Sequence, residues 1–212
     1  EKGEYAAEFR HAFLKYRNAG DYALSDIDFT VKKGETIGII GGTGSGKSSL
    51  VNLIPRFYDV CGGNVLVNGV DVKDMAVSEL RDKIGVVPQK AMLFKGTIRE
   101  NLLWGNENAS DADIEEAVKA AQALDVIKAK GGYDCEIEQG GKNLSGGQRQ
   151  RLTIARALVR KPEILILDDS ASALDFATDA ALRKSLRELD YSPAVFIVSQ
   201  RTSSILHADK II

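Results

Sequence analysis

Cysteine and histidine are scarce in this sequence of 212 residues. The only cysteines are Cys61 and Cys135, and the only histidines are His11 and His207. Two cysteines that lie far apart exclude a fold built on disulfide bonds, and they fit a reducing compartment. Two histidines are too few for a metal site made from histidine ligands.

Long apolar runs and a surplus of one charge are also missing. No stretch approaches the ~18 apolar residues that a membrane-spanning helix needs, and no signal-peptide pattern opens the chain. The 28 Lys and Arg residues nearly balance the 30 Asp and Glu residues, for a net charge of −2. Without a strong positive field the chain has no general attraction for phosphate backbones, and we expect no nucleic-acid partner.

The length fits one domain with a sizeable core, which we expect to span residues 1–212. The hydrophobic share of 44% and the charged share of 27% are ordinary for a folded protein. The sequence opens without Met and stops where a strand begins, at residues 210–212. We therefore expect a domain that belongs to a longer polypeptide.

Short apolar segments alternate with segments of helical periodicity. The sequence predicts strands at residues 37–40, 84–87, 164–167 and 195–198, and helices after Ser110 and at residues 148–159 and 178–189. This alternation is typical of an α/β fold, with a parallel sheet covered on both faces. In addition, Asn68 and Gly69 separate two short apolar runs, at residues 65–67 and 70–72, which predicts a β-hairpin.

Residues 41–48, GGTGSGKS, match the pattern G-x-x-x-x-G-K-[ST] at every fixed position. A predicted strand precedes them and an apolar helical pattern follows, which favours a phosphate-binding loop over a flexible Gly/Ser connector. Glycines let backbone N–H groups turn toward phosphate oxygens, and the start of the helix adds partial positive charge. Lys47 can reach the outer phosphates of a nucleotide, and the Ser48 hydroxyl can bind Mg²⁺. The residues expected to contact the nucleotide here are Gly42, Thr43, Gly44, Ser45, Gly46, Lys47, Ser48 and Ser49.

Polar residues follow three of the predicted strands. Asp168 and Asp169 come directly after one strand, and Gln89 and Gln200 follow two others after one intervening residue. The carboxyl ends of parallel strands meet at one edge of the sheet, where α/β proteins bind their ligands. We expect Asp168 to hold Mg²⁺ beside the phosphate loop, directly or through water. Taken alone, either glutamine would be interpreted as a solvated loop residue.

Residues 144–148, LSGGQ, are the signature motif of ABC proteins. With the phosphate loop and Asp168, in the family's order, this motif makes the chain resemble the ATP-binding domain of an ABC transporter over nearly its whole length. The resemblance implies ATP hydrolysis, with ATP and Mg²⁺ as cofactors. It also implies a P-loop NTPase core with a mostly parallel sheet flanked by helices, an antiparallel β subdomain and an α-helical signature subdomain. The core with its β subdomain would comprise about residues 1–88 and 150–212, and the helical subdomain about residues 89–149.

Residues 145–147 should open a helix, whose free N–H groups and dipole would form a second anion site. One nucleotide does not need two phosphate sites in one chain. The ABC family uses a head-to-tail dimer, in which ATP lies between the phosphate loop of one subunit and the signature helix of the other. The resemblance therefore implies that Ser145, Gly146, Gly147 and Gln148 bind the ATP of a second ABC domain. A glycine-rich helix cap is the alternative explanation.

Further roles follow from the same resemblance. Gln89 is the Q-loop residue, which senses Mg²⁺ and the attacking water, and joins Ser48 and Asp168 as a metal ligand. Tyr16 matches the aromatic residue that stacks on adenine, and Phe13 is the neighbouring candidate. The D-loop, which crosses the dimer interface, corresponds to residues 172–175.

Residues 93–102 resemble the segment of ABC exporters that contacts the membrane domain. Exporters usually carry both domains in one polypeptide. We therefore expect a membrane domain in the same polypeptide, an exported substrate, and a location at the cytoplasmic face of the cell membrane.

Two catalytic positions depart from the family. Asp169 stands where the family has the Glu that acts as general base, and Gln200 stands at the switch position, which is normally His. Asp is shorter by one methylene, about 1.5 Å of reach, and a misplacement of ~1 Å can lower a rate by about 10²-fold. Gln cannot carry a proton or a positive charge as His can. We expect Asp169, Gln200, Gln89 and Lys47 to be the catalytic residues of a site that hydrolyses ATP slowly.

These departures favour a heterodimeric exporter whose other subunit supplies Glu and His. A homodimer with Asp169 as a sluggish base is the alternative. The same departures also motivate an ATP-dependent dimerisation clamp with little hydrolysis of its own. A soluble ABC protein that acts on DNA or ribosomes is disfavoured, because only 55 positions separate Gln89 from Leu144, too few for a coiled coil, and the chain has one phosphate loop.

Overall fold

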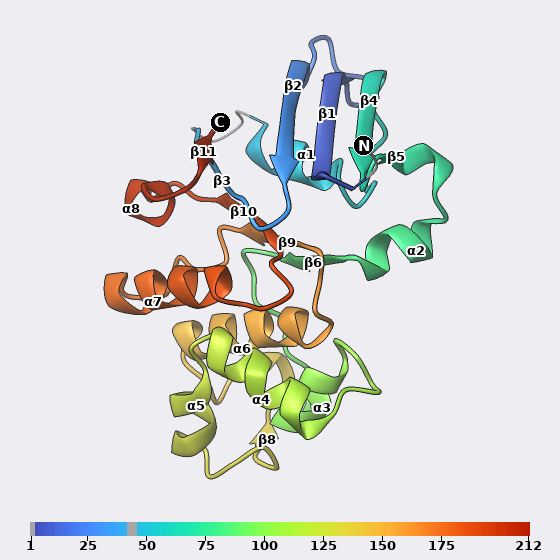
Figure 1. The fold of residues 1–212 in the computed structure, drawn as a ribbon. Coiled ribbons are helices and arrows are strands. Elements are labelled where there is room, and N and C mark those ends of the chain that lie inside the picture. The colour runs from blue at the N-terminus through green and yellow to red at the C-terminus, as the bar shows by residue number, and fades with distance from the viewer. Residues whose placement is uncertain (1–2, 42–45) are drawn as a thin grey trace.

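The computed structural model describes residues 3–41 and 46–212. An antiparallel sheet lies at the top of Figure 1, a parallel sheet crosses the middle, and a group of helices fills the lower part. One hydrophobic core lies between the two sheets, and a second lies between the parallel sheet and the lower helices. The predicted phosphate-loop residues Gly42, Thr43, Gly44 and Ser45 lie outside the described residues.

The parallel sheet has the strand order β11-β3-β10-β9-β6. Its strands are β3 (Thr36–Ile39), β6 (Ile84–Val87), β9 (Ile164–Asp168), β10 (Ala194–Val198) and β11 (Lys210–Ile211). Both faces of the sheet are covered, so β3, β9 and β10 are almost continuously buried and consist mainly of Ile, Leu and Val. The register pairs Val87 with Leu167, and Val198 with both Asp168 and Ile39. The carboxyl ends are therefore level, and the residues that follow them gather at one edge.

The antiparallel sheet has the order β2-β1-β4-β5. Its strands are β1 (Tyr5–Leu14), β2 (Leu24–Lys32), β4 (Gly62–Val67) and β5 (Val70–Asp71). The predicted hairpin is confirmed, since Asn68 and Gly69 both have positive φ, 50° and 77°, as a tight two-residue turn requires. Its second strand is shorter than predicted, because the Asp71 carboxylate accepts from the Lys73 N–H and starts the 3₁₀ helix η1 (Val72–Asp74).

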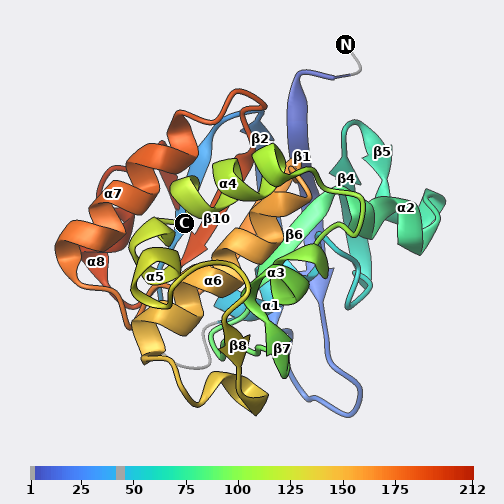
Figure 2. The same ribbon diagram turned by 90° about the horizontal axis from the view of Figure 1, so that it is seen from below.

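Helices cover the lower face of the parallel sheet. They include α3 (Ile98–Leu103), α4 (Asp111–Ala120), α5 (Leu124–Ala129), α6 (Gly146–Val159) and α7 (Phe176–Arg187), while α1 (Lys47–Asn52), α2 (Val77–Asp82) and α8 (Thr202–Ile205) lie elsewhere around the sheets. Figure 2 shows α6 among α3, α4 and α5, and α6 contacts α3 and α4. The smaller elements are β7 (Gly96–Thr97), β8 (Glu136–Ile137) and the 3₁₀ helix η2 (Gln139–Gly141). Along the described residues, no helix is both long and apolar enough to cross a membrane.

The predicted α/β fold is confirmed, with its parallel sheet, its antiparallel sheet and its flanking helices. The helix predicted at 178–189 begins two residues earlier, at Phe176, because the Asp175 carboxylate caps it by accepting from the Thr178 N–H, and it ends at Arg187. The helix after Ser110 is capped in the same way by Ser110 and Asp113. Side-chain caps thus set the starts of both helices.

A buried amide ties the segment before α3 to that helix. Asn101 is 3% exposed, and its side chain accepts from the Phe94 N–H at 2.8 Å and donates to the carbonyls of Phe94 and Thr97 at 2.9 and 3.0 Å. Asn101→Ala should lower the free energy of unfolding by about 2–3 kcal/mol, because it leaves these backbone groups unpaired. Urea denaturation of the chain measures this, with the exposed Asn108→Ala as control. Equal losses of unfolding free energy in the two variants would contradict a stabilising role of the Asn101 hydrogen bonds.

Candidate active site

Gly46 and Lys47 directly follow residues 42–45 in the predicted phosphate loop. Gly46 has φ 86°, and a Cβ there would lie 2.9 Å from the Ala23 carbonyl oxygen, so any other residue would be strained. Lys47 is the first residue of α1, and its Nζ donates to the Gly41 carbonyl at 2.6 Å. The ammonium group therefore lies just beyond the carboxyl end of β3, at the sheet edge described above.

Ser48 and Asp168 meet although 120 positions separate them in sequence. The Ser48 hydroxyl donates to Asp168 Oδ1 at 3.2 Å, which joins α1 to the end of β9. A hydroxyl and a carboxylate are hard oxygen donors of the kind that Mg²⁺ prefers. In the part of the chain that the structure describes, no three His, Cys, Asp or Glu residues gather as a metal cluster. A site with one carboxylate leaves coordination positions for phosphate oxygens and water, so these residues fit Mg²⁺ with a nucleotide.

Asp169 has a left-handed backbone conformation, with φ 54°. Its N–H donates to the Val198 carbonyl at 2.8 Å, which ties the end of β9 to the end of β10. Partial burial raises the pKa of the Asp169 carboxyl above its usual range. The positive charges of Lys47 and Arg201 lower this pKa, and the negative charge of Asp168 raises it. A carboxylate with a raised pKa beside a lysine is suited to accept a proton.

Gln89 and Gln200 are exposed and follow β6 and β10. The level strand ends bring both positions to the edge that holds Asp168 and Asp169. The structure thus gathers the four strand-end residues that the sequence singled out.

Tyr16 follows β1 and lies next to α1. Its hydroxyl hydrogen-bonds with the Ser49 hydroxyl, and its ring packs edge-on against Tyr58, with ring centroids 5.0 Å apart. Phe13 instead packs edge-on against Tyr22, at 5.6 Å. Tyr16 thus contacts α1, the helix that follows the predicted phosphate loop.

The signature residues form the start of α6. Ser145 is the N-cap, and Ser145 and Gln148 make a reciprocal capping box, with 3.2 Å from the Gln148 N–H to Ser145 Oγ and 3.0 Å from the Ser145 N–H to Gln148 Oε1. Gly146 and Gly147 occupy the first turn, and a Cβ on Gly147 would lie 3.2 Å from the Ala173 carbonyl oxygen. A cleft of about 420 Å³ opens there, lined by Ser145, Gly146, Gly147, Arg151, Ala173, Leu174, Asp175 and Thr178.

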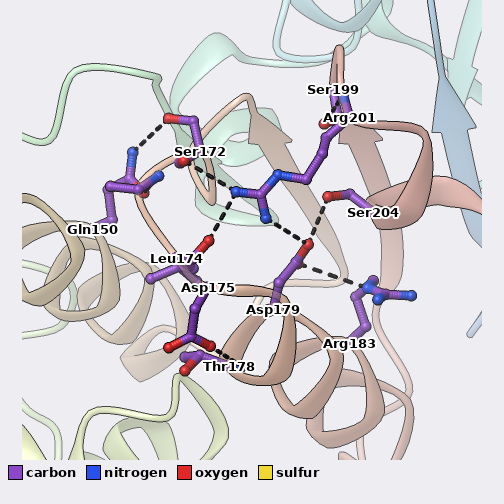
Figure 3. Close-up of polar contacts among 11 residues, drawn as sticks. Gln150, Ser172, Leu174, Asp175, Thr178, Asp179, Arg183, Ser199, Arg201 and Ser204 are labelled. Carbon is purple, nitrogen blue, oxygen red and sulfur yellow. Dashed lines mark hydrogen bonds and ion pairs between the residues drawn. The ribbon is translucent and has the colours of Figure 1, made fainter.

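Three residues that the sequence analysis did not single out surround residues 172–175, as Figure 3 shows. Gln150 of α6, Asp179 of α7 and Arg201 after β10 all make polar contacts there or next to it. Asp179 carried a signal in the sequence, because it shares the buried face of α7 with Leu182 and Leu186. A charge at helical spacing from buried leucines is unusual and indicates a specific partner.

The sequence pattern of the ABC transporter family matches residues 24–172. That span includes the phosphate loop, Gln89, the signature residues and Asp168. The chain belongs to the ABC transporter family.

The relatives of this ABC chain include exporter-type proteins. It is 46% identical over 206 residues to an uncharacterized ABC transporter ATP-binding protein of Bacillus subtilis, covering 97% of this chain and 36% of that protein. It is 43% identical over 203 residues to a putative multidrug export ATP-binding/permease protein of Staphylococcus aureus, covering 95% and 35%. The structure of a bacterial Atm1-family ABC exporter with ATP bound superimposes with a TM-score of 0.90 at 35% identity, covering 97% of this chain and 36% of that one. The ABC chain thus spans about a third of the length of the curated relatives that it matches.

The charge of Asp169 should destabilise the folded ABC domain. Folding raises the pKa of this carboxyl, so its protonated form favours the folded state. The stability that the protonated carboxyl contributes is lost as the pH rises through the folded-state pKa. Asp169→Asn should therefore be more stable than the parent at about pH 7, and the difference should disappear below the unfolded pKa of about 3.9. Asn also tolerates the left-handed conformation.

Urea denaturation at both pH values measures the difference. Asp74→Asn, at an exposed position of η1, is the control and should leave the stability nearly unchanged. A parent that is more stable than Asp169→Asn at neutral pH would contradict the role of burial.

Proposed function

We propose that this chain is the ATP-hydrolysing domain of an exporter and binds ATP with Mg²⁺ at the edge of the parallel sheet. The observation that carries the proposal is the contact of Ser48 Oγ with Asp168 Oδ1 at 3.2 Å, next to Lys47 and Asp169. Two oxygen ligands beside a lysine suit a magnesium-bound triphosphate. The solved exporter with ATP bound and the relative named for multidrug export support the proposal.

Ser48, Asp168 and Gln89 would hold Mg²⁺, which when bound supplies positive charge to the phosphate oxygens. Lys47 would exchange the Gly41 carbonyl for a phosphate oxygen. The nucleotide contacts of Gly42 to Ser45, Gly46 and Ser49 belong to the same proposal, and Tyr16 would stack on the adenine ring.

Asp169 would orient the attacking water and accept its proton. Its raised pKa makes it a better proton acceptor than an ordinary aspartate. Gln200 would donate a neutral hydrogen bond toward the outer phosphate, where a histidine could add charge. The shorter reach of Asp169 compared with glutamate and the neutral side chain of Gln200 outweigh this gain, so we expect the chain's own site to hydrolyse ATP slowly.

The signature end of α6 would serve a second nucleotide. Ser145, Gly146, Gly147 and Gln148 line or border an open cleft whose facing residues belong to the 172–175 segment. A second ABC domain in a head-to-tail dimer would place its phosphate loop there. Because Asp169 and Gln200 weaken one site while the signature residues are complete, we propose a heterodimer.

The membrane-facing side would lie around residues 85–105. Phe94 and Trp104 are 44% and 70% exposed, and both line a groove of about 260 Å³ with Arg156. This groove lies next to the strand end that leads to Gln89. We propose that it receives the membrane domain of the same polypeptide, at the cytoplasmic face of the membrane, and that residues 89–149 act as a helical subdomain beside the nucleotide-binding core. The relative named as an ATP-binding/permease protein supports the fusion of both domains.

An ATP-dependent dimerisation clamp is the second candidate. Asp169 and Gln200 favour it, because each weakens hydrolysis without removing a binding group. The two candidates differ in whether the assembled protein turns over ATP at this chain's signature end.

Lys47→Ala should weaken ATP binding at least ten-fold, or by about 1.4 kcal/mol, because the phosphates lose their closest cation. Titration calorimetry with Mg·ATP measures the affinity. Lys33→Ala, at an exposed lysine before β3, is the control and should bind like the parent. Equal affinities of Lys47→Ala and the parent would contradict the proposed phosphate contact.

The asymmetric dimer predicts different outcomes for two substitutions in the assembled exporter. Asp169→Asn should leave most ATP turnover intact, since this chain's own site contributes little. Gly147→Glu should abolish turnover, because a carboxylate would stand where a phosphate must bind. Phosphate release by purified exporter measures both, and thermal unfolding checks that each variant is folded.

If Asp169→Asn silences the exporter as completely as Gly147→Glu, Asp169 is the working base and the asymmetric dimer is wrong. If the parent exporter binds ATP without turnover, the clamp is the better description.

A further inference from the structure

Asp179 is a buried charge on the apolar face of α7. It is 2% exposed, and its carboxylate accepts from the Ser204 hydroxyl at 2.6 Å and from Arg201 Nη1 at 3.4 Å. Arg183 Nε lies 3.7 Å from its other oxygen, one turn further along the helix. A carboxylate in the core is costly unless it is paired, so these contacts offset the burial of Asp179 and hold its side chain in place.

Arg201 uses its remaining N–H groups on a different segment. Its Nη2 donates to the carbonyls of Leu174 and Ser172, at 2.8 and 3.1 Å. The planar guanidinium therefore joins Asp179 to two backbone oxygens at once, as Figure 3 shows. A lysine has one compact ammonium group and cannot reproduce this fork. We call Arg201, Asp179 and these two carbonyls the Arg201 bridge.

The backbone of Arg201 is fixed as well. Its N–H donates to the Ser199 hydroxyl at 2.9 Å, so the turn that carries Gln200 is closed by a hydrogen bond across it. The Arg201 bridge thus begins at the residue directly after the switch position.

Segment 172–174 is held from its other side by α6. Gln150, which is 6% exposed, donates through Nε2 to the Ser172 hydroxyl at 3.1 Å and accepts from the Ala173 N–H at 2.9 Å. One turn before Gln150, Gly147 approaches the Ala173 carbonyl so closely that a Cβ would lie 3.2 Å from it. The segment therefore touches the signature end of α6 on one side and the turn of Gln200 on the other.

We propose that Arg201, fixed by Asp179, is a positioning residue that sets segment 172–174, and through it the signature end of α6, relative to Gln200. The signature end of α6 and the turn of Gln200, which serve different ATP molecules, are then held in one geometry by side-chain contacts. They are not neighbours in the sequence. This proposal rests on the dimeric ATP hydrolysis proposed above. It makes Arg201 important for turnover, and it gives the buried Asp179 side chain a role in holding Arg201.

Arg183 provides the matched control. It contacts the same carboxylate from within α7, and the contacts of the Arg201 bridge with the Ser172 and Leu174 carbonyls do not involve it. A purely structural role of the buried charge predicts similar effects for Arg183→Gln and Arg201→Gln. A positioning role predicts that only Arg201→Gln slows turnover.

The first experiment measures ATP turnover by the assembled exporter. Arg201→Gln should lower kcat at least five-fold with the KM for ATP within about two-fold of the parent, and Arg183→Gln should leave both values within about two-fold. Arg201→Lys restores the charge opposite Asp179 without the fork, so it should recover only part of the lost kcat and also serves if Arg201→Gln fails to fold. Equal losses in the Arg183 and Arg201 variants, or full recovery in Arg201→Lys, would overturn the proposal.

The second experiment measures amide hydrogen exchange of residues 172–175 in the intact protein without ATP. Exchange there should be at least ten-fold faster in Arg201→Gln than in the parent, and unchanged in Arg183→Gln. This readout does not depend on hydrolysis. A parent protein without ATP turnover would contradict the proposed function, and the exchange rates would still show whether the Arg201 bridge holds residues 172–175 in place. Unchanged exchange in Arg201→Gln, or faster exchange with undiminished kcat, rejects the positioning role.

Discussion

The parallel register of β3, β9 and β10 is the constraint on which the rest of the structure depends. Successive residues of β9 face different hydrophobic cores, with Ile164 and Ile166 in the upper core and Leu165 and Leu167 in the lower one. A slip of one residue would exchange the two sets of side chains, and each set would then have to pack in a core shaped for the other. The strand ends are level for the same reason. The burial that stabilises the sheet therefore also gathers the polar residues at its edge.

Features that depend on a few neighbouring residues could be predicted from the sequence. The hairpin at Asn68 and Gly69 needs only two residues that accept positive φ. The start of α6 follows from Ser145 and Gln148, whose spacing makes a capping box. Short runs of Ile, Leu and Val indicate the buried strands. In each case the physical cause lies within a few positions of the structure that it produces.

Features that depend on distant partners or on irregular backbone were missed. Strand β1 was not identified, because its pairing with β2 shifts register between Phe9 and Ala12, and His11 there has φ 47°. Such an irregularity breaks the two-residue alternation by which a strand is recognised. The contacts of Arg201 with Ser172, Leu174 and Asp179 span 22 to 29 positions, and only the folded chain brings them together. Short elements such as β7 and β8, with two residues each, offer no periodicity to read.

The left-handed backbone at Asp169 restricts which residues suit this position. Short polar side chains such as Asp and Asn tolerate a φ of 54° because they hydrogen-bond locally, whereas longer side chains cost roughly 1 kcal/mol or more there. A change to glutamate would lengthen the reach toward water but would place a less tolerant residue in that conformation. At this residue a longer side chain therefore reaches further but raises the conformational energy of the backbone. A substitution at this position therefore changes the energy of the backbone as well as the position of the carboxylate.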